Sequence, residues 1–168
     1  DRLGFGKVIW RFDPMILTDT IGIEELLDKA HNIGEQLKGY TEKMVFSYAD
    51  IRTYRKVQSN LEKNGINYRE FEAEDMLAIA KGLSELNNSW GYTLATCGEK
   101  VDLEPYGVVH NKCVDDDLMI KYFSDDVKLM EFLGVEIVKG DLFNPEDTII
   151  KRKNNKDKGQ REFCGCIV

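Results

Sequence analysis

The chain has 168 residues, 42% of them hydrophobic and 32% charged, which is enough for one domain with a substantial core. The formal net charge of −7 disfavours a role in nucleic-acid binding, because neutralising phosphates requires clustered Lys and Arg. Apolar stretches are short and interrupted by charges, and there is no signal-peptide anatomy, so we expect a cytoplasmic protein that does not enter a membrane.

Strands and helices alternate along the first hundred residues. The predicted strands occupy residues 7–12, 43–49 and 92–97. Apolar residues at helical spacing predict helices over residues 23–37, 51–61 and 73–88. The first strand is expected to end at Asp13-Pro14, because proline has no N–H to donate, and Asp50 is expected to cap the second helix.

The last third of the chain predicts short helices followed by loop and tail. Helix starts are expected at residues 115–117 and 124–126, and the second of these helices should end at Gly134. Residues 139–148 have a loop-like composition. Residues 151–161 carry six basic side chains against Asp157 but no aromatic residue, which favours a solvated linker over a nucleic-acid contact. We therefore divide the chain into a main part, 1–150, and a basic, cysteine-containing tail, 151–168.

The alternation of strands and helices predicts a parallel α/β sheet, because parallel strands need long crossover connections. Three strands are too few for a closed barrel, which takes about eight strands and roughly 250 residues. The chain is therefore either a small open sheet or one part of a (β/α) barrel. The first residue is Asp1 rather than Met, which favours the second interpretation.

Charged side chains lie at the carboxyl ends of the predicted strands, where parallel α/β folds place their sites. Arg11, Asp13, Asp50 and Glu99 are the catalytic candidates, with roles in orienting a substrate or transferring protons. Asp13 and Asp50 could equally be capping or turn residues. Arg11 could pair with either aspartate or hold an anionic ligand, since a charge within a strand needs a partner.

Four cysteines are candidate metal ligands: Cys97, Cys113, Cys164 and Cys166. Without a secretory signal they are expected to be reduced, and four thiolates meet the count of a tetrahedral site. Their spacing differs from the usual Cys-x-x-Cys pair, so a single shared site remains a hypothesis. Cys97 alone could be a nucleophile or a small core residue.

Five separate motifs resemble one bacterial family. They lie, in order, at residues 8–14, 37–41, 96–100, 111–116 and 156–166. Together they resemble the functionally uncharacterised family known as domain of unknown function 1848. Its members are longer, with a preceding half that has a Ser-Arg-Arg-Thr-Asp type opening. After the Cys-Gly-Cys they continue to a cysteine cluster likened to the iron–sulfur motif of radical S-adenosylmethionine enzymes.

This resemblance implies that the chain is the C-terminal part of a TIM-type barrel with a 4Fe–4S iron–sulfur site. It implies no reaction, so whether the chain is an enzyme stays open. One hypothesis is a fragment of an iron–sulfur enzyme doing radical chemistry on an unknown small molecule. The alternative is a non-catalytic protein in which the four cysteines bind a structural zinc or another metal.

Overall fold

The computed structural model describes residues 2–97, 101–112, 114–138, 140 and 148–151. These residues fall into two compact units, the first ending at Asn111 and the second beginning at Lys112. The predicted tail, 151–168, lies outside the described residues except for Lys151. No helix among the described residues is long and apolar enough to cross a bilayer.

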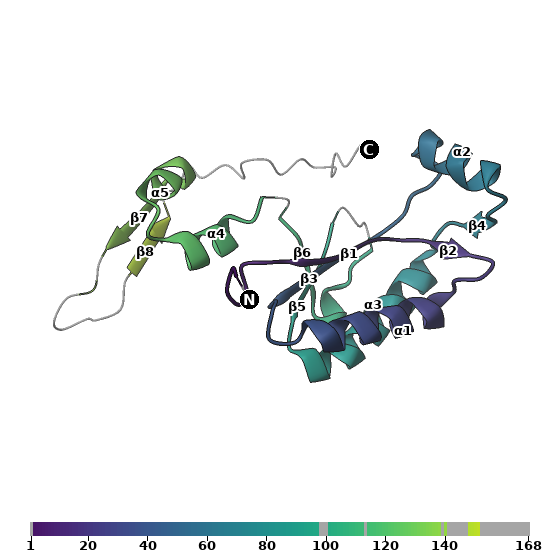
Figure 1. The fold of residues 1–168 in the computed structure, drawn as a ribbon, viewed down its shortest axis with the longest axis horizontal. Coiled ribbons are helices and arrows are strands. Elements are labelled where there is room, and N and C mark those ends of the chain that lie inside the picture. Colours follow the sequence, from purple (N-terminus) through teal and green to yellow (C-terminus); the bar gives the residue numbers. More distant parts are fainter. Residues whose placement is uncertain (1, 98–100, 113, 139, 141–147, 152–168) are drawn as a thin grey trace. The chain divides into compact units, whose positions relative to one another are not determined.

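The first unit is built on a parallel four-stranded sheet (Figure 1). Its strands are, in spatial order, β1 (Trp10–Met15), β3 (Lys43–Tyr48), β5 (Thr93–Thr96) and β6 (Val108–His110). Its helices are α1 (Ile23–Leu37), α2 (Arg55–Lys63), α3 (Ala73–Trp90) and the 3-10 turn η1 (Glu104–Tyr106). A small antiparallel pair joins β2 (Leu17–Thr18) to β4 (Tyr68–Arg69). The three strands predicted from the sequence are thus confirmed as parallel neighbours.

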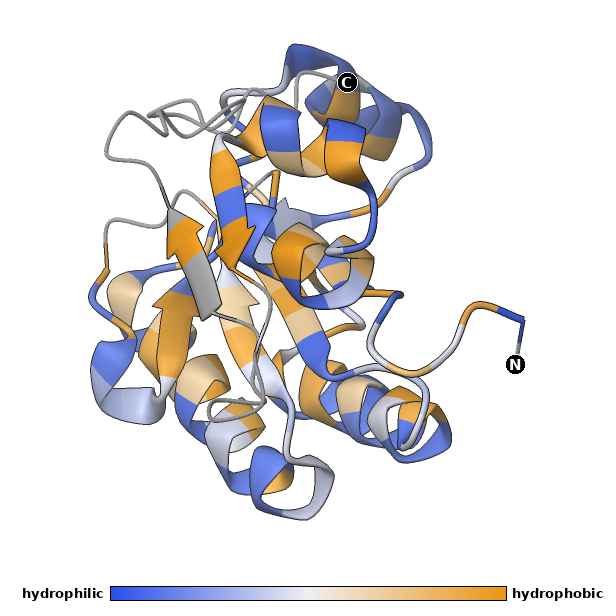
Figure 2. Ribbon diagram, turned by 90° about the vertical axis from the view of Figure 1, so that its left-hand side faces the viewer, coloured by the Kyte–Doolittle hydropathy of each residue, from blue (hydrophilic) through white to orange (hydrophobic). Residues whose placement is uncertain are grey.

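Helices α1 and α3 pack side by side against one face of the sheet (Figure 1). Alternate strand residues, including Trp10, Phe46 and Leu94, enter this core, where they meet Ala30 of α1 and Ile79 of α3. Figure 2 shows hydrophobic segments along the strands, whereas the helices carry both hydrophobic and hydrophilic residues. The pattern follows from the twofold period of a strand meeting the 3.6-residue period of a helix.

The first strand does not end at Asp13-Pro14, so that prediction was wrong. Phe12 pairs with Phe46, the register then shifts, and Met15 pairs with Tyr48. Proline is tolerated because β1 is the edge strand of the described sheet, where a missing N–H costs no ladder hydrogen bond. The peptide bond between Asp13 and Pro14 is cis.

The second predicted helix begins later than expected. α2 starts at Arg55 with Tyr54 as its N-cap, so the prediction that Asp50 caps it was wrong. The preceding residues form turns, with the N–H of Tyr54 donating to the carbonyl of Ile51. Ile51 is fully buried in this turn and not on a helix face. It was counted as the first apolar residue of the predicted helix because its distance in sequence from the next apolar residues is that of a helix.

A closed barrel is not seen in the described part of the chain, where the parallel strands form an open sheet. What stands is a mixed α/β fold with parallel strands and helices. The barrel remains a prediction.

The second unit contains two short helices and an antiparallel strand pair. These are α4 (Asp116–Phe123), α5 (Val127–Leu133), β7 (Val135–Val138) and β8 (Thr148–Lys151). Asp115 and Asp126 cap the two helices by accepting from the N–H of Leu118 and of Leu129, each at 3.0 Å. Both predicted helix starts are confirmed, as is the end at Gly134. The strand pair was not predicted.

Gly34 allows α1 to approach α3, and replacing it should destabilise the first unit. A Cβ at this position would lie 2.6 Å from two atoms of the Trp90 ring. That ring cannot easily move, because its Nε1 donates to Glu35 at 2.9 Å. We expect Gly34→Ala to lower the free energy of unfolding by about 1–3 kcal/mol, measured by urea denaturation. Asn32→Ala, exposed on the same helix, should change it by less than about 0.5 kcal/mol; an equal effect would contradict the close approach.

Candidate functional site

The face of the sheet opposite α1 and α3 carries a different set of side chains. Residues next to the core-facing ones, such as Val45 and Ala95, form a second small cluster with Ile9 and Cys97. Arg11 pairs in register with Val45, which in turn pairs with Ala95. Because neighbouring residues of a strand point to opposite faces, Arg11 belongs to this second face. We call it the helix-free face, since neither α1 nor α3 packs there.

Polar side chains follow this apolar row at the carboxyl ends of the strands. Asp13 lies two residues beyond Arg11 on β1, and Ser47 lies two beyond Val45 on β3. Cys97 and Asn111 have the same relation to β5 and β6. The ladder continues to this level, because the N–H of Asn111 donates to the carbonyl of Thr96 at 2.8 Å. The four ends therefore form one polar row: Asp13, Ser47, Cys97 and Asn111.

Asp13 holds Arg11 and Ser47 together. Its Oδ2 accepts from Nε of Arg11 at 2.9 Å and from Nη2 of the same guanidinium, and its Oδ1 accepts from the Ser47 hydroxyl. The Arg11 side chain is 45% exposed, whereas that of Asp13 is 17% exposed. Both carboxylate oxygens are thus engaged, so Asp13 orients its two neighbours. The prediction that Arg11 pairs with one of the two aspartates is confirmed for Asp13.

Cys97 and Asn111 form the other half of the polar row. Cys97 is 8% exposed and Asn111 is 3% exposed. Nδ2 of Asn111 donates to Sγ of Cys97 at 3.1 Å. The buried sulfur of Cys97 thus has an amide donor beside it. Cys97 belongs to the cluster on the helix-free face.

The loop after β3 is held by Glu70 near the end of β4. Its two carboxylate oxygens accept from consecutive N–H groups, Ile51 at 3.2 Å and Arg52 at 2.9 Å. Two backbone N–H groups pointing at one carboxylate form a small anion-binding site, which this chain fills itself. Asp50, at the start of this loop, accepts from the Thr53 hydroxyl at 2.6 Å. Asp50 therefore has the geometry of a turn residue.

Removing the Glu70 carboxylate should loosen this loop. Hydrogen bonds to charged groups contribute about 1.5–3 kcal/mol, so in Glu70→Ala the amides of Ile51 and Arg52 should exchange about tenfold faster or more. Amide hydrogen exchange followed by NMR measures this directly. Glu85→Ala, on an exposed face of α3, is the matched control and should leave both rates unchanged. Unchanged rates in Glu70→Ala would show that the carboxylate does not hold the loop.

Several predicted site residues lie outside the described residues. Glu99, Cys113, Cys164 and Cys166 belong to this group. The proposed sharing of one metal by four cysteines therefore stays a prediction, as does a role for Glu99.

Three consecutive aspartates, residues 115–117, bring carboxylate oxygens within 4.8 Å of one another. Each of these aspartates has a partner within the second unit. Asp115 is the N-cap of α4, while Nζ of Lys112 donates to Asp116 and to Asp117, each at 2.6 Å. Burial disfavours the ammonium form, but the two carboxylates outweigh it and raise the pKa of Lys112 above its ordinary value. A lysine ammonium thus already occupies the space between two of the carboxylates.

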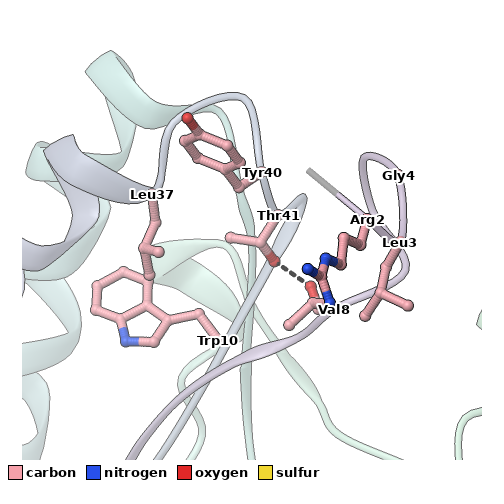
Figure 3. Close-up of a pocket in the computed structure, with 8 residues that line it drawn as sticks. All are labelled: Arg2, Leu3, Gly4, Val8, Trp10, Leu37, Tyr40 and Thr41. Atoms are coloured by element: carbon pink, nitrogen blue, oxygen red, sulfur yellow. Dashed lines mark hydrogen bonds between the residues drawn. The ribbon is translucent and has the colours of Figure 1, made fainter.

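A cavity of about 310 Å³ lies at the opposite end of the sheet (Figure 3). Val8 and Thr41 line it just before β1 and β3 begin, and the Thr41 hydroxyl donates to the Val8 carbonyl at 2.6 Å. Leu37 and Tyr40 add apolar walls. The cavity therefore lies at the amino ends of the strands, away from the polar row.

Sequence reasoning did not single out two members of the polar row. Ser47 lies within the predicted strand 43–49 and Asn111 begins the motif at residues 111–116, but neither was proposed as a site residue. The signal for Ser47 is the twofold period, which places it on the face of Val45. Asn111 could not be placed without β6, a strand of only three residues.

A family model described as a domain of unknown function, DUF1848, matches residues 1–168. The comparisons found no matching curated protein and no matching solved structure.

Proposed function

Starting from the fact that this chain belongs to the DUF1848 family, we propose that it forms part of a barrel-type enzyme with an iron–sulfur cluster. Its site would bind a small-molecule substrate at the carboxyl ends of β1, β3, β5 and β6. The observation that carries the proposal is the polar row. At the carboxyl ends of the strands, the helix-free face carries the guanidinium of Arg11, the hydroxyl of Ser47 and the buried sulfur of Cys97. Asp13 orients the guanidinium, and the sulfur accepts a hydrogen bond from an amide.

Such a grouping is poorly suited to stability alone. A strand end facing a core would be expected to carry apolar side chains, and a charge there needs a partner. Carboxyl ends of parallel strands are instead the usual place for ligand binding and catalysis in α/β folds. The helix-free face is the one that would turn inward if further strands closed a barrel, which supports a barrel-type site.

Cys97 fits the role of a cluster ligand. Iron–sulfur clusters are held by cysteine thiolates, and hydrogen bonds to the sulfurs tune them. Its sulfur is buried and accepts a hydrogen bond from Asn111, which supports this role. We propose Cys113, Cys164 and Cys166 as further ligands on the strength of their number and type. When bound, such a cluster supplies one-electron chemistry, and with S-adenosylmethionine it supplies radical chemistry.

The chain's own residues would bind and orient the substrate. Arg11, fixed by Asp13, would hold an anionic group, and Ser47 would accept a hydrogen bond beside it. Asp50 and Glu99 are proposed for proton transfer, because both follow strands that end at this edge of the sheet.

A non-catalytic zinc protein is the second candidate. The observation that favours it is the burial of Cys97, because structural zinc sites are closed whereas catalytic metals keep an open position. In that case the cysteines would tie the tail to the first unit and would take no part in a reaction.

Anaerobic production of the full chain with iron and sulfide tests the proposal. We expect bound iron and acid-labile sulfide, together with the brown colour of an iron–sulfur protein and its loss on reduction. Zinc in place of iron, with no visible absorption, would support the alternative. A protein that binds neither metal, and whose melting temperature is unchanged by chelator, would overturn both.

A further inference from the structure

We propose that the ligand of this site carries a carboxylate, which Arg11 binds, with a hydrogen-bond donor on the adjacent carbon, which Ser47 accepts. The inference rests on the proposed function and names its substrate class as a hydroxy- or amino-carboxylate. It follows from how Asp13 arranges its two neighbours.

The first step is the orientation of the guanidinium. A guanidinium has five N–H donors in a planar fork that matches a carboxylate, and Asp13 engages its Nε side through a single oxygen, Oδ2. The Arg11 side chain is 45% exposed, so a ligand carboxylate can reach the guanidinium from solvent. Because Asp13 already restricts the fork, less conformational entropy is lost when a ligand binds.

The second step concerns the direction of the Ser47 hydrogen bond. Ser47 donates its hydroxyl proton to Oδ1 of Asp13, so its oxygen presents lone pairs to a ligand. A ligand group that meets Ser47 must therefore be a donor, such as a hydroxyl or an ammonium. Arg11 and Ser47 donate to the two oxygens of the same Asp13 carboxylate. They are therefore close enough for one small molecule to contact both.

The third step favours a carboxylate over a phosphate. Asp13 places a negative charge directly beside Arg11. This charge repels a phosphate dianion more strongly than it repels a carboxylate monoanion. Phosphate sites usually add backbone N–H donors, and the two consecutive donors of the nearby loop, on Ile51 and Arg52, are taken by Glu70. A single guanidinium beside an aspartate is a better match for one carboxylate.

Side-chain NMR on the full chain tests the inference. The probes are glycolate, acetate, glycolamide and inorganic phosphate, titrated at constant ionic strength with chloride as the balancing anion. We expect saturable shifts of the Arg11 Nε–H signal in the order glycolate, then acetate, then phosphate, with no effect of glycolamide. Arg11→Lys should weaken glycolate binding about tenfold, because an ammonium cannot form the two-pronged contact.

Ser47→Ala separates the two contacts. It should bring glycolate down to the affinity of acetate while leaving acetate binding nearly unchanged. Arg11→Lys retains the charge beside Asp13, and a melting temperature near that of the parent would show that its loss of binding is not unfolding.

Three results would overturn the proposal: glycolamide binding as well as glycolate, phosphate binding more tightly than either carboxylate, or no saturable shift with any probe. The titration is run both with and without bound metal. Metal bound without carboxylate binding would remove this inference and leave the proposed function standing. Carboxylate binding by a protein that binds no metal would leave this inference standing and remove the proposed iron–sulfur function.

Discussion

Phe46→Ala should remove about 3–5 kcal/mol from the free energy of unfolding of the first unit. Phe46 is fully buried near the middle of β3, between its pairing partners Phe12 and Thr96. Its ring meets that of Tyr48 edge-on at 5.8 Å, and truncation would leave a cavity against α1 and α3. Because domains of this size unfold with about 5–15 kcal/mol, the loss is a large share of the total.

Urea denaturation measures this effect, and Phe5→Ala is its matched control. Phe5 is 50% exposed near the start of the chain, so the same truncation should cost less than about 1 kcal/mol there. If the two variants had the same denaturation midpoint, the placement of Phe46 at the centre of the core would be wrong.

If Cys97 is a ligand of the proposed metal centre, Cys97→Ser should remove most of the metal that the parent protein binds. Serine is nearly isosteric, but its neutral hydroxyl is a poor ligand for the soft metal ions that thiolates select. Metal-dependent stability should fall with it, because metal that binds only the folded state adds directly to the free energy of unfolding. We expect the gain in melting temperature on metal loading to shrink to a small fraction of that seen in the parent.

Metal analysis and thermal melts of anaerobically prepared protein measure both quantities. Thr96→Ser is the control one residue earlier on β5, since it keeps the hydroxyl that donates to the Phe46 carbonyl at 2.9 Å. It should retain the full metal content. Undiminished metal in Cys97→Ser would exclude Cys97 from the ligand set, whichever metal is present.

The main strands could be predicted because each is an apolar run long enough to be distinguished from its surroundings. β3 and β5 were placed to within one or two residues, and their parallel order followed from the helices between them. β6 was missed because three residues are too few to show a period, and its pairing with β5 depends on contacts distant in sequence. The strand pair of the second unit was missed for the same reason.

The path of β1 through Asp13-Pro14 shows a different limit of sequence reasoning. The missing proline N–H was judged as if the strand had a neighbour on both sides, whereas β1 has only β3 among the described strands. The predicted capping of the second helix by Asp50 was wrong because the loop after Asp50 is held by Glu70, which is distant in sequence. Local pattern cannot show either fact.

The site was partly predictable. Arg11 and Asp13 were identified because a charge within a buried strand demands a partner, and the structure supplies it. Ser47 could have been added from its spacing, but its role depends on the direction of one hydrogen bond to Asp13. The pairing of Cys97 with Asn111 joins two strands and has no signal in sequence spacing.

The burial of Trp10 and Trp90 in one core has a spectroscopic consequence. The chain's two tryptophans, Trp10 and Trp90, both belong to that unit, with ring centroids 5.9 Å apart and nearly perpendicular planes. Tryptophan fluorescence therefore reports only on the parallel sheet and its helices. Circular dichroism also records α4 and α5, so a transition seen by dichroism but absent from the emission would identify independent melting of the second unit.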